Sequence, residues 1–239
     1  MRVEIIKCLQ DNYSYLIIDK KSNQACVIDP SEASPILNFC KKNDIIIKYI
    51  LNTHHHYDHV GGNKEIKKKF NSKILGYLDD KNRIPEIDIL LKDQEIWKKN
   101  NFEAKIFHIP GHTAGHICYY FFNQKIIFTG DTLFSLGCGK IFEGTYSQMF
   151  NSLSLFKTFP LDTKIYCGHE YTLKNSKFCI KYDPQNKMLI NKTLEIEKKI
   201  SQGNPTMPST IKEELDCNIF LRANDIESFS KLRDLKDNF

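Results

Sequence analysis

The segment from Thr53 to His59 limits what this chain can fold into more than any other, because it places four histidines and one aspartate within seven positions. Neutral imidazole and carboxylate groups are the ligands that zinc and iron prefer. Alternate side chains of an extended loop point to the same side, so His54 and His56 can reach one ion. Asp58 and His59 are then available to a second ion. The segment therefore predicts a metal site.

An ordinary polar loop, or a helical turn in which His55 and His59 share one face, is the alternative interpretation of this segment. The flanking sequence argues against it. The apolar, β-prone run 49–51 precedes the histidines directly, and Gly61 and Gly62 break the chain just after them. We therefore expect the histidines to lie where a buried strand leaves the core.

Composition supports a globular protein with a substantial core, since 41% of the 239 residues are hydrophobic and 12% are aromatic. The eight cysteines are scattered, with no CxxC pair and no secretory signal pattern at the start. We expect reduced thiols and a cytoplasmic location. No stretch approaches the roughly 20 apolar residues of a membrane helix, so a soluble protein without a membrane partner is expected.

The net charge of +5 comes almost wholly from lysine and weakly favours an anionic substrate. Lysine clusters such as 67–69 are not accompanied by a nucleic-acid-binding module or by interleaved arginines and aromatic residues. Solvated helix faces explain them better. We expect no nucleic-acid partner, and we expect a monomer.

Three later apolar runs repeat the arrangement of a short strand, a break and one potential ligand. The runs are 106–109, 126–128 and 165–167, and the ligands that follow them are His112, Asp131 and His169 respectively. Together with the histidine-rich loop after the strand 45–51, four separated segments present a ligand just past a strand end. Such strand ends meet at one edge of a sheet, so we expect these side chains to converge.

The remaining patterns predict hairpin strands in the first 28 residues, helices over 32–42 and 59–70, and lysine- and glutamate-rich helices from Thr172 onward. The helical C-terminal part is short for an independent domain. We expect a catalytic domain over residues 1–170 and a small helical substrate-binding region over 171–239.

Seven ligands are too many for one tetrahedral ion and suit two divalent ions that share a carboxylate. We assign His54, His56 and His112 to one ion and Asp58, His59 and His169 to the other, with Asp131 and a hydroxide as bridges. Zinc is the expected metal, with iron or manganese as alternatives. His55 and His108 are interpreted as structural, His116 as structural or as a hydrogen-bond partner of a ligand, and Asp29 as such a partner.

Four motifs of this ligand set resemble those of the metallo-β-lactamase superfamily. They are the runs 53–59 and 110–116 and the pairs 130–131 and 168–169. The resemblance implies an α+β fold, an αββα sandwich with a two-metal site at one edge. Because this superfamily hosts many reactions, the activity must be argued from other residues.

Further stretches are similar to the glyoxalase II branch, the hydroxyacylglutathione hydrolases. They are 11–13, 131–144, 167–172 and 218–222. The resemblance implies that Lys140, Phe142, Tyr171 and Arg222 contact glutathione. Some members have tyrosine where this chain has Phe142, and the basic residue expected soon after Arg222 is replaced by the stretch 223–225. Lys231, Arg233 and Lys236 are candidates to replace it.

The resemblance implies a two-metal thioester hydrolase that converts S-D-lactoylglutathione into glutathione and D-lactate, a step of methylglyoxal detoxification. Asp58 and Asp131 would be its catalytic carboxylates, acting with the bridging hydroxide. A thiolate leaves without a strong general acid because the pKa of a thiol is only about 8.5.

Several rival functions are weighed against this prediction. A phosphodiesterase, nuclease or lactonase of the same fold is the main alternative. A thioesterase with Cys138 or Cys167 as nucleophile would leave the metal ligands unexplained. A lactamase is disfavoured because Asp131 stands where several of those enzymes use cysteine. A mono-iron dioxygenase would not need the second ligand set. A non-catalytic metal-binding protein is the rival from another class.

Overall fold

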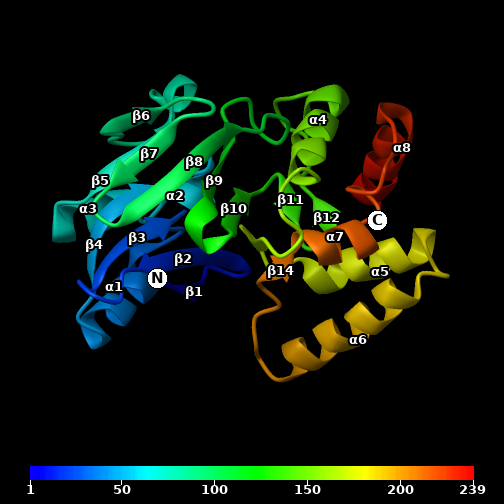
Figure 1. Cartoon of the computed structure of the whole chain (residues 1–239), viewed down its shortest axis with the longest axis horizontal. Helices are drawn as coiled ribbons and strands as arrows, with labels where there is room; N and C mark the ends of the chain where they lie inside the picture. The colour runs from blue at the N-terminus through cyan, green and yellow to red at the C-terminus, as the bar shows by residue number, and fades with distance from the viewer. The chain divides into compact units, whose positions relative to one another are not determined.

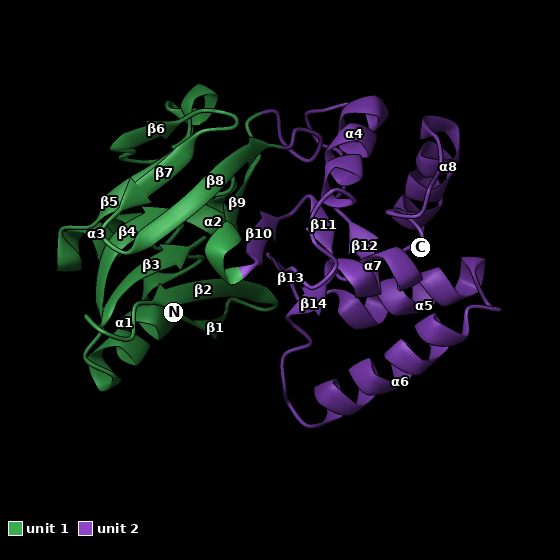
Figure 2. Ribbon diagram, viewed as in Figure 1, with its two compact units in different colours: residues 1–108, 115–124 green, residues 109–114, 125–239 purple.

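The chain forms two compact units, and each is built from both helices and strands. The computed structural model describes residues 1–239, and Figure 1 shows the order of the elements. The first unit holds residues 1–108 and 115–124, and the second holds residues 109–114 and 125–239 (Figure 2).

A mixed six-stranded sheet forms the centre of the first unit. Its strands follow the chain order without interruption. The first three strands pair antiparallel with one another, and each of the last three pairs in parallel with the strand before it. The strands are β1 (Arg2–Cys8), β2 (Asn12–Ile18), β3 (Gln24–Ile28), β4 (Ile46–Leu51), β5 (Lys73–Tyr77) and β6 (Ile89–Leu91).

One face of this sheet is covered by α1 (Ala33–Lys42) and α3 (Asn63–Phe70). Ile36 of α1 and Ile66 of α3 are fully buried in a core cluster that also contains Val27 of β3 and Ile50 of β4. The short helix α2 (Tyr57–Val60) precedes α3 and is separated from it by the Gly61-Gly62 pair.

Three strands of a second sheet lie over the other face within the first unit. They are β7 (Ile96–Lys99), β8 (Phe102–His108) and β9 (Ile117–Phe121), paired antiparallel. Tyr49 of β4 meets the ring of Trp97 edge-on at 5.0 Å between centroids, and it also contacts Phe102. Aromatic packing of this kind fills the space between the two sheets. Two short 3₁₀ turns, η1 (Leu78–Asp80) and η2 (Phe122–Gln124), complete this unit.

Strand β10 (Ile126–Gly130) of the second unit pairs in parallel with β13 (Lys164–Cys167), which pairs antiparallel with β14 (Ser209–Thr210). A small hairpin of β11 (Leu133–Phe134) and β12 (Gly137–Cys138) follows β10.

Five helices form the rest of the second unit. Thr145 and Gln148 make a capping box at the start of the first, and Thr210 and Glu213 make one at the start of the fourth. Rings of Phe178, Phe220 and Phe229 form an aromatic core among these helices. The helices are α4 (Tyr146–Phe156), α5 (Thr172–Tyr182), α6 (Lys187–Ser201), α7 (Ile211–Cys217) and α8 (Ile226–Asp237).

Most of the predicted elements are confirmed. The helix expected over 32–42 is α1, and the three later apolar runs are the strands β8, β10 and β13. The single helix expected over 59–70 is instead α2 and α3, because the backbone around Gly61 and Gly62 packs against the loop after β3. A side chain at Gly61 would lie 2.4 Å from the carbonyl oxygen of Ser31. No helix in the structure combines the length and hydrophobicity that crossing a bilayer requires.

Candidate metal centre

The histidine-rich loop of the first unit is held by one buried carboxylate, that of Asp29. Asp29 follows β3 in the left-handed conformation, with φ of 45°, and its backbone N–H donates to the Leu51 carbonyl at 3.0 Å. Its carboxylate accepts hydrogen bonds from the backbone N–H of Thr53 at 2.7 Å and from the Thr53 hydroxyl at 2.6 Å. The start of the loop is therefore fixed to the end of β3.

Polar side chains hold three of the predicted ligands in this unit. Nδ1 of His59 lies 3.1 Å from the Asp29 carboxylate, and Nδ1 of His54 lies 3.0 Å from the Thr53 hydroxyl. The Asn12 side chain donates to a carboxylate oxygen of Asp58 at 3.0 Å and to the Asp58 carbonyl at 3.1 Å. A hydrogen bond to the side-chain atom that faces away from the metal orients the atom that coordinates it, as metal sites commonly require.

His55 is directed to a different set of partners. Its Nδ1 lies 3.5 Å from the carboxylate of Asp80, which is fully buried and ion-paired to Arg83. This placement agrees with the prediction that His55 is structural. His116 stacks on His54 with 4.6 Å between ring centroids and an angle of 18°, so it supports the plane of a predicted ligand ring.

Asp131 is the centre of the polar cluster in the second unit. One of its carboxylate oxygens, Oδ2, lies 3.2 Å from Nε2 of His169 and 3.6 Å from Nε2 of His112. Nδ1 of His112 is held at 2.7 Å from the Lys140 carbonyl oxygen. Gly139 allows this close packing, since a Cβ there would lie 1.9 Å from the Asp131 carbonyl oxygen.

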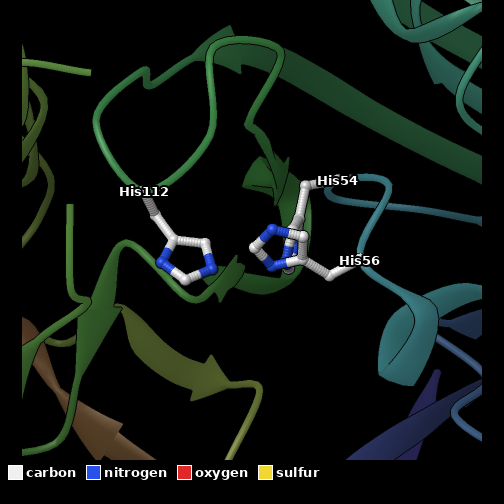
Figure 3. Close-up of side chains that lie close together, drawn as sticks. All are labelled: His54, His56 and His112. Carbon is white, nitrogen blue, oxygen red and sulfur yellow. The ribbon is translucent and has the colours of Figure 1, made fainter. Parts of the chain in front are cut away.

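Three groups of side chains have their ligand atoms within 4.8 Å of one another. Figure 3 shows the first group, with His54 and His56 on one loop and His112 on another. Most members are buried, whereas His56 and Asp58 are partly exposed. The groups are His54, His56 and His112; Asp29, His54 and His59; and Asp58, His59 and His169.

The chemistry of these groups suits divalent ions. Each is made of imidazoles with or without carboxylates, and no thiol belongs to any of them. Such a set fits zinc, iron or manganese. In addition, His54, His59 and His112 each have Nδ1 fixed by an oxygen atom, which leaves Nε2 as the coordinating atom. The residues present therefore fit the metal ions that the sequence predicts.

The four predicted glutathione contacts all lie in the second unit. The ring of Tyr171 stacks on His169 at 4.7 Å, and Phe142, which is 60% exposed, meets His112 edge-on at 5.2 Å. The Lys140 ammonium lies 5.8 Å from the Phe142 ring centroid. Three of the four are thus next to predicted metal ligands or to one another.

Arg222 differs from the other three because its guanidinium is ion-paired with Asp183. A hydrogen bond from the Asn186 side chain, together with this ion pair, lowers the pKa of the Asp183 carboxyl. An anionic substrate could therefore bind Arg222 only by displacing the Asp183 carboxylate or by sharing the guanidinium with it.

Helix α8 carries two neighbouring cationic residues, Arg233 and Lys236. Arg233 is buried and donates to the Cys138 carbonyl at 2.8 Å, close in sequence to Lys140. Burial lowers the pKa of Lys236 to about 8, helped by the positive charges of Arg233 and Lys174. Sequence reasoning named Arg233 and Lys236 only as alternatives, although their spacing of three places them on one helix face.

Asn12 and Thr53 are the polar partners of ligands that sequence reasoning did not assign. Asn12 lies in the stretch 11–13 and Thr53 begins the histidine run, so both stand inside recognised motifs. Their roles depend on contacts with Asp58 and Asp29, which are distant in sequence.

Comparison with known proteins identifies both parts of the chain. A family model described as the metallo-beta-lactamase superfamily matches residues 11–169. One described as the hydroxyacylglutathione hydrolase C-terminus matches residues 170–239.

Curated relatives carry the same name. A hydroxyacylglutathione hydrolase of Pelagibacter ubique (strain HTCC1062) is 66% identical over 100% of both chains. One of Bradyrhizobium sp. (strain ORS 278) is 39% identical over 97% of this chain and 91% of the relative.

Solved structures share the fold at low identity. The crystal structure of ETHE1 from Myxococcus xanthus has a TM-score of 0.74 at 22% identity and covers 98% of this chain and 90% of that one. A B3 metallo-beta-lactamase has a TM-score of 0.73 at 20% identity, covering 93% and 100%. The predicted α+β fold class, a metallo-β-lactamase sandwich with a C-terminal helical part, is confirmed.

The superfamily match and the histidine and aspartate groups together indicate that the chain binds divalent metal ions. Family models account for almost the whole sequence, and one relative is similar from end to end. The chain belongs to the hydroxyacylglutathione hydrolase family, the glyoxalase II branch of the metallo-β-lactamase superfamily.

Proposed function

We propose that this protein hydrolyses the thioester S-D-lactoylglutathione to glutathione and D-lactate, a step of methylglyoxal detoxification. Full-length similarity to hydroxyacylglutathione hydrolases supports the substrate class. The observation that carries the reaction type is the position of Asp131, whose Oδ2 faces Nε2 of both His112 and His169. A carboxylate between two histidines suits the bridge of a two-metal site.

Two divalent ions per chain, with zinc the expected metal, are part of this proposal. His54, His56 and His112 would hold one, Asp58, His59 and His169 the other, and Asp131 both. Ions bound there would lower the pKa of water and polarise the thioester carbonyl. The alternative group of Asp29, His54 and His59 is better explained by Asp29 as a hydrogen-bond acceptor, because that carboxylate already accepts from Thr53 twice.

The groups of the second unit would position the substrate. Tyr171, stacked on His169, places an aromatic ring next to a ligand, and Phe142 places an exposed ring next to another. Glutathione carries two carboxylates, which Lys140 and Arg222 would bind. Lys236 strengthens this part of the proposal, because burial and the charges of Arg233 and Lys174 disfavour its ammonium and a bound anion would stabilise it. Arg233 is itself ion-paired with Asp237.

The proposed division of labour follows the chain. Residues 1–170 would form the catalytic domain and 171–239 the substrate-binding region. Support comes from the two family models, which meet between residues 169 and 170. Tyr171, Arg222, Arg233 and Lys236 all belong to the second of these segments.

A cysteine nucleophile has little support. Cys138 and Cys167 are both buried, and burial raises the pKa of Cys167 to about 12 and that of Cys138 in the same direction. A thiol with such a pKa supplies almost no thiolate near neutral pH. The metal ligands would also have no purpose in that mechanism.

Parallel assays would test the proposal. Protein of measured metal content is offered S-D-lactoylglutathione, a phosphodiester such as bis-p-nitrophenyl phosphate, and a simple lactone. We expect turnover of the thioester above all others, lost on chelation and restored by zinc. Turnover of the phosphodiester or the lactone without turnover of the thioester would reject the proposal in favour of another hydrolase of this fold.

A matched pair of variants links that activity to the site. Asp131→Asn removes the shared carboxylate, whereas Asp162→Asn removes an exposed carboxylate of the same unit that pairs with Lys125. We expect the first to abolish thioester turnover and the second to leave it unchanged.

A further inference from the structure

The Asp29 carboxylate contacts one predicted metal ligand, His59, directly and a second, His54, through Thr53. It is 2% exposed and lies within 3.1 Å of three donors: the N–H and hydroxyl of Thr53, and Nδ1 of His59. A carboxylate can only accept hydrogen bonds. His59 must therefore carry its proton on Nδ1 to make this contact.

Thr53 extends the same constraint to His54. Its hydroxyl has a single proton, which the 2.6 Å contact assigns to Asp29. Toward Nδ1 of His54, at 3.0 Å, the Thr53 oxygen is then an acceptor. His54 must therefore also carry its proton on Nδ1, and its lone pair lies on Nε2.

We propose that Asp29, with Thr53 as a relay, sets the tautomer of His54 and His59 together and so prepares one ligand of each of the two metal ions. The inference rests on the ligand assignment in the proposed function. Asp29 and Thr53 are positioning residues here, since neither touches substrate or metal. One carboxylate thereby controls both sites of the pair.

The surroundings leave this carboxylate little freedom to adapt. The Asp29 backbone carbonyl accepts from the Ser14 hydroxyl at 2.7 Å, and its N–H is bound to Leu51. The His54 ring is stacked on His116. Neither the carboxylate nor the ring can turn without breaking buried contacts, so the order of protons along the relay is determined by Asp29.

Replacement of Asp29 by asparagine should reverse that order. The amide oxygen would still accept the hydrogen bond from the Thr53 N–H. The amide NH₂ would then face the Thr53 hydroxyl and Nδ1 of His59. His59 would have to accept on Nδ1. The Thr53 hydroxyl, now an acceptor from the amide, would donate to Nδ1 of His54. Both histidines would move their proton to Nε2, the atom needed for the metal.

Substitutions at Thr53 separate the effect on His54, which depends on Thr53, from the effect on His59, which contacts Asp29 directly. Thr53→Val keeps the shape but removes the hydroxyl, so only His54 loses its partner. Thr53→Ser keeps the hydroxyl and is the matched control. His59 contacts Asp29 directly and should be unaffected by either change.

The test is the ¹⁵N NMR signature of the imidazole tautomers in metal-free protein, recorded at about pH 8, where an unperturbed histidine is neutral. We expect Nδ1–H for His54 and His59 in the wild type and in Thr53→Ser, and Nε2–H for both in Asp29→Asn. Thr53→Val should alter His54 alone. Zinc affinity from chelator competition should fall about 10- to 100-fold at both sites in Asp29→Asn and at one site in Thr53→Val.

Wild-type tautomers in Asp29→Asn, or an equal change of His54 and His59 in Thr53→Val, would overturn the relay. Should Asp29→Asn not fold, the Thr53 pair still decides the matter, because unaltered His54 in Thr53→Val contradicts it. The tautomers are measured without substrate. Expected tautomers in a protein without thioesterase activity would therefore reject the proposed function and leave the relay standing.

Discussion

At the scale of single residues, Asp131 offers the sharpest test of the metal centre. Its removal takes away the only carboxylate that contacts both His112 and His169. We expect Asp131→Ala to lose metal and to lower kcat more than about 100-fold, equivalent to about 3 kcal/mol of barrier. Metal analysis and steady-state kinetics check this. Full metal content in the variant would contradict the bridge.

The lowered pKa of Lys236 leads to a prediction of how substrate binding depends on pH. Its pKa of about 8 means that the ammonium is charged at neutral pH and is lost above about pH 8. If it binds a substrate carboxylate, KM should rise above that pH while kcat changes little. Lys236→Gln should remove the dependence. Lys231→Gln, on the same helix but paired with Glu227, should keep it. An unchanged profile in Lys236→Gln would exclude this lysine from the binding of the substrate.

The same group affects stability with a definite sign. The ordinary pKa of 10.5 applies in the unfolded chain, so between about pH 8 and 10.5 the unfolded state binds more protons at Lys236 than the folded state. Its contribution to the free energy of unfolding should therefore increase with pH across that window. Urea unfolding of wild type and Lys236→Gln at pH 7.5 and 9.5 measures the difference.

Residue-level prediction depended on residue type, and the structure brings several of the predicted ligands within 4.8 Å of one another. Histidine and aspartate past strand ends could be recognised from the sequence, because few other roles require them at that spacing. The hydrogen-bond partners of these ligands could not be recognised in this way. Asn12 and Asp58 are 46 positions apart, and neither asparagine nor threonine has a pattern that reveals which carboxylate it meets in the folded chain.

At the scale of elements, the β11–β12 hairpin is held by side chains from the helical segment of the second unit. Asn218 donates to the Gly137 carbonyl at 3.0 Å, and buried Glu214 accepts from the Leu136 N–H at 2.8 Å. Asn175 donates to the Ser135 carbonyl at 3.1 Å. The hairpin leads directly to Lys140, whose carbonyl holds His112. The helices therefore help to place a metal ligand.

Asn218→Leu tests this connection. It removes the donor to the hairpin, and an unsatisfied buried carbonyl costs about 1–3 kcal/mol. We expect a lower free energy of unfolding and faster loss of metal to a chelator. Asn186→Ala is the control, because it removes the cap of α6 at a cost of about 1 kcal/mol without contacting the hairpin. Equal metal loss in both variants would show that the hairpin is not the cause.

Element prediction from the sequence found α1 and the strands β4, β8, β10 and β13, where periodicity and breaks agree. It did not find the strands β5, β6, β7 and β9. It assigned one helix to residues 59–70, where the structure has α2 and α3 on either side of Gly61 and Gly62. The glycine pair is itself the local signal of the break, and the backbone there packs against Ser31 and Pro30.

At the scale of the whole molecule, metal binding should add to the stability of the fold. Ligands from many segments are brought together only in the folded chain, so metal binds the native state preferentially. Free zinc at 100 times its dissociation constant should add about 2.7 kcal/mol per site. Thermal unfolding of metal-free protein with and without zinc measures this, with magnesium as the control. An unchanged midpoint with zinc would contradict the predicted coupling.

All eight cysteines are buried, and burial raises the pKa of each. A thioester readily exchanges its acyl group with any accessible thiolate, and the disulfide form of glutathione would exchange with the same thiolate to give a mixed disulfide. A chain without such thiolates is inert to both side reactions. The cysteines then do not compete with water for the acyl group, and the protein can handle thioesters through many turnovers without acylating or glutathionylating its own thiols.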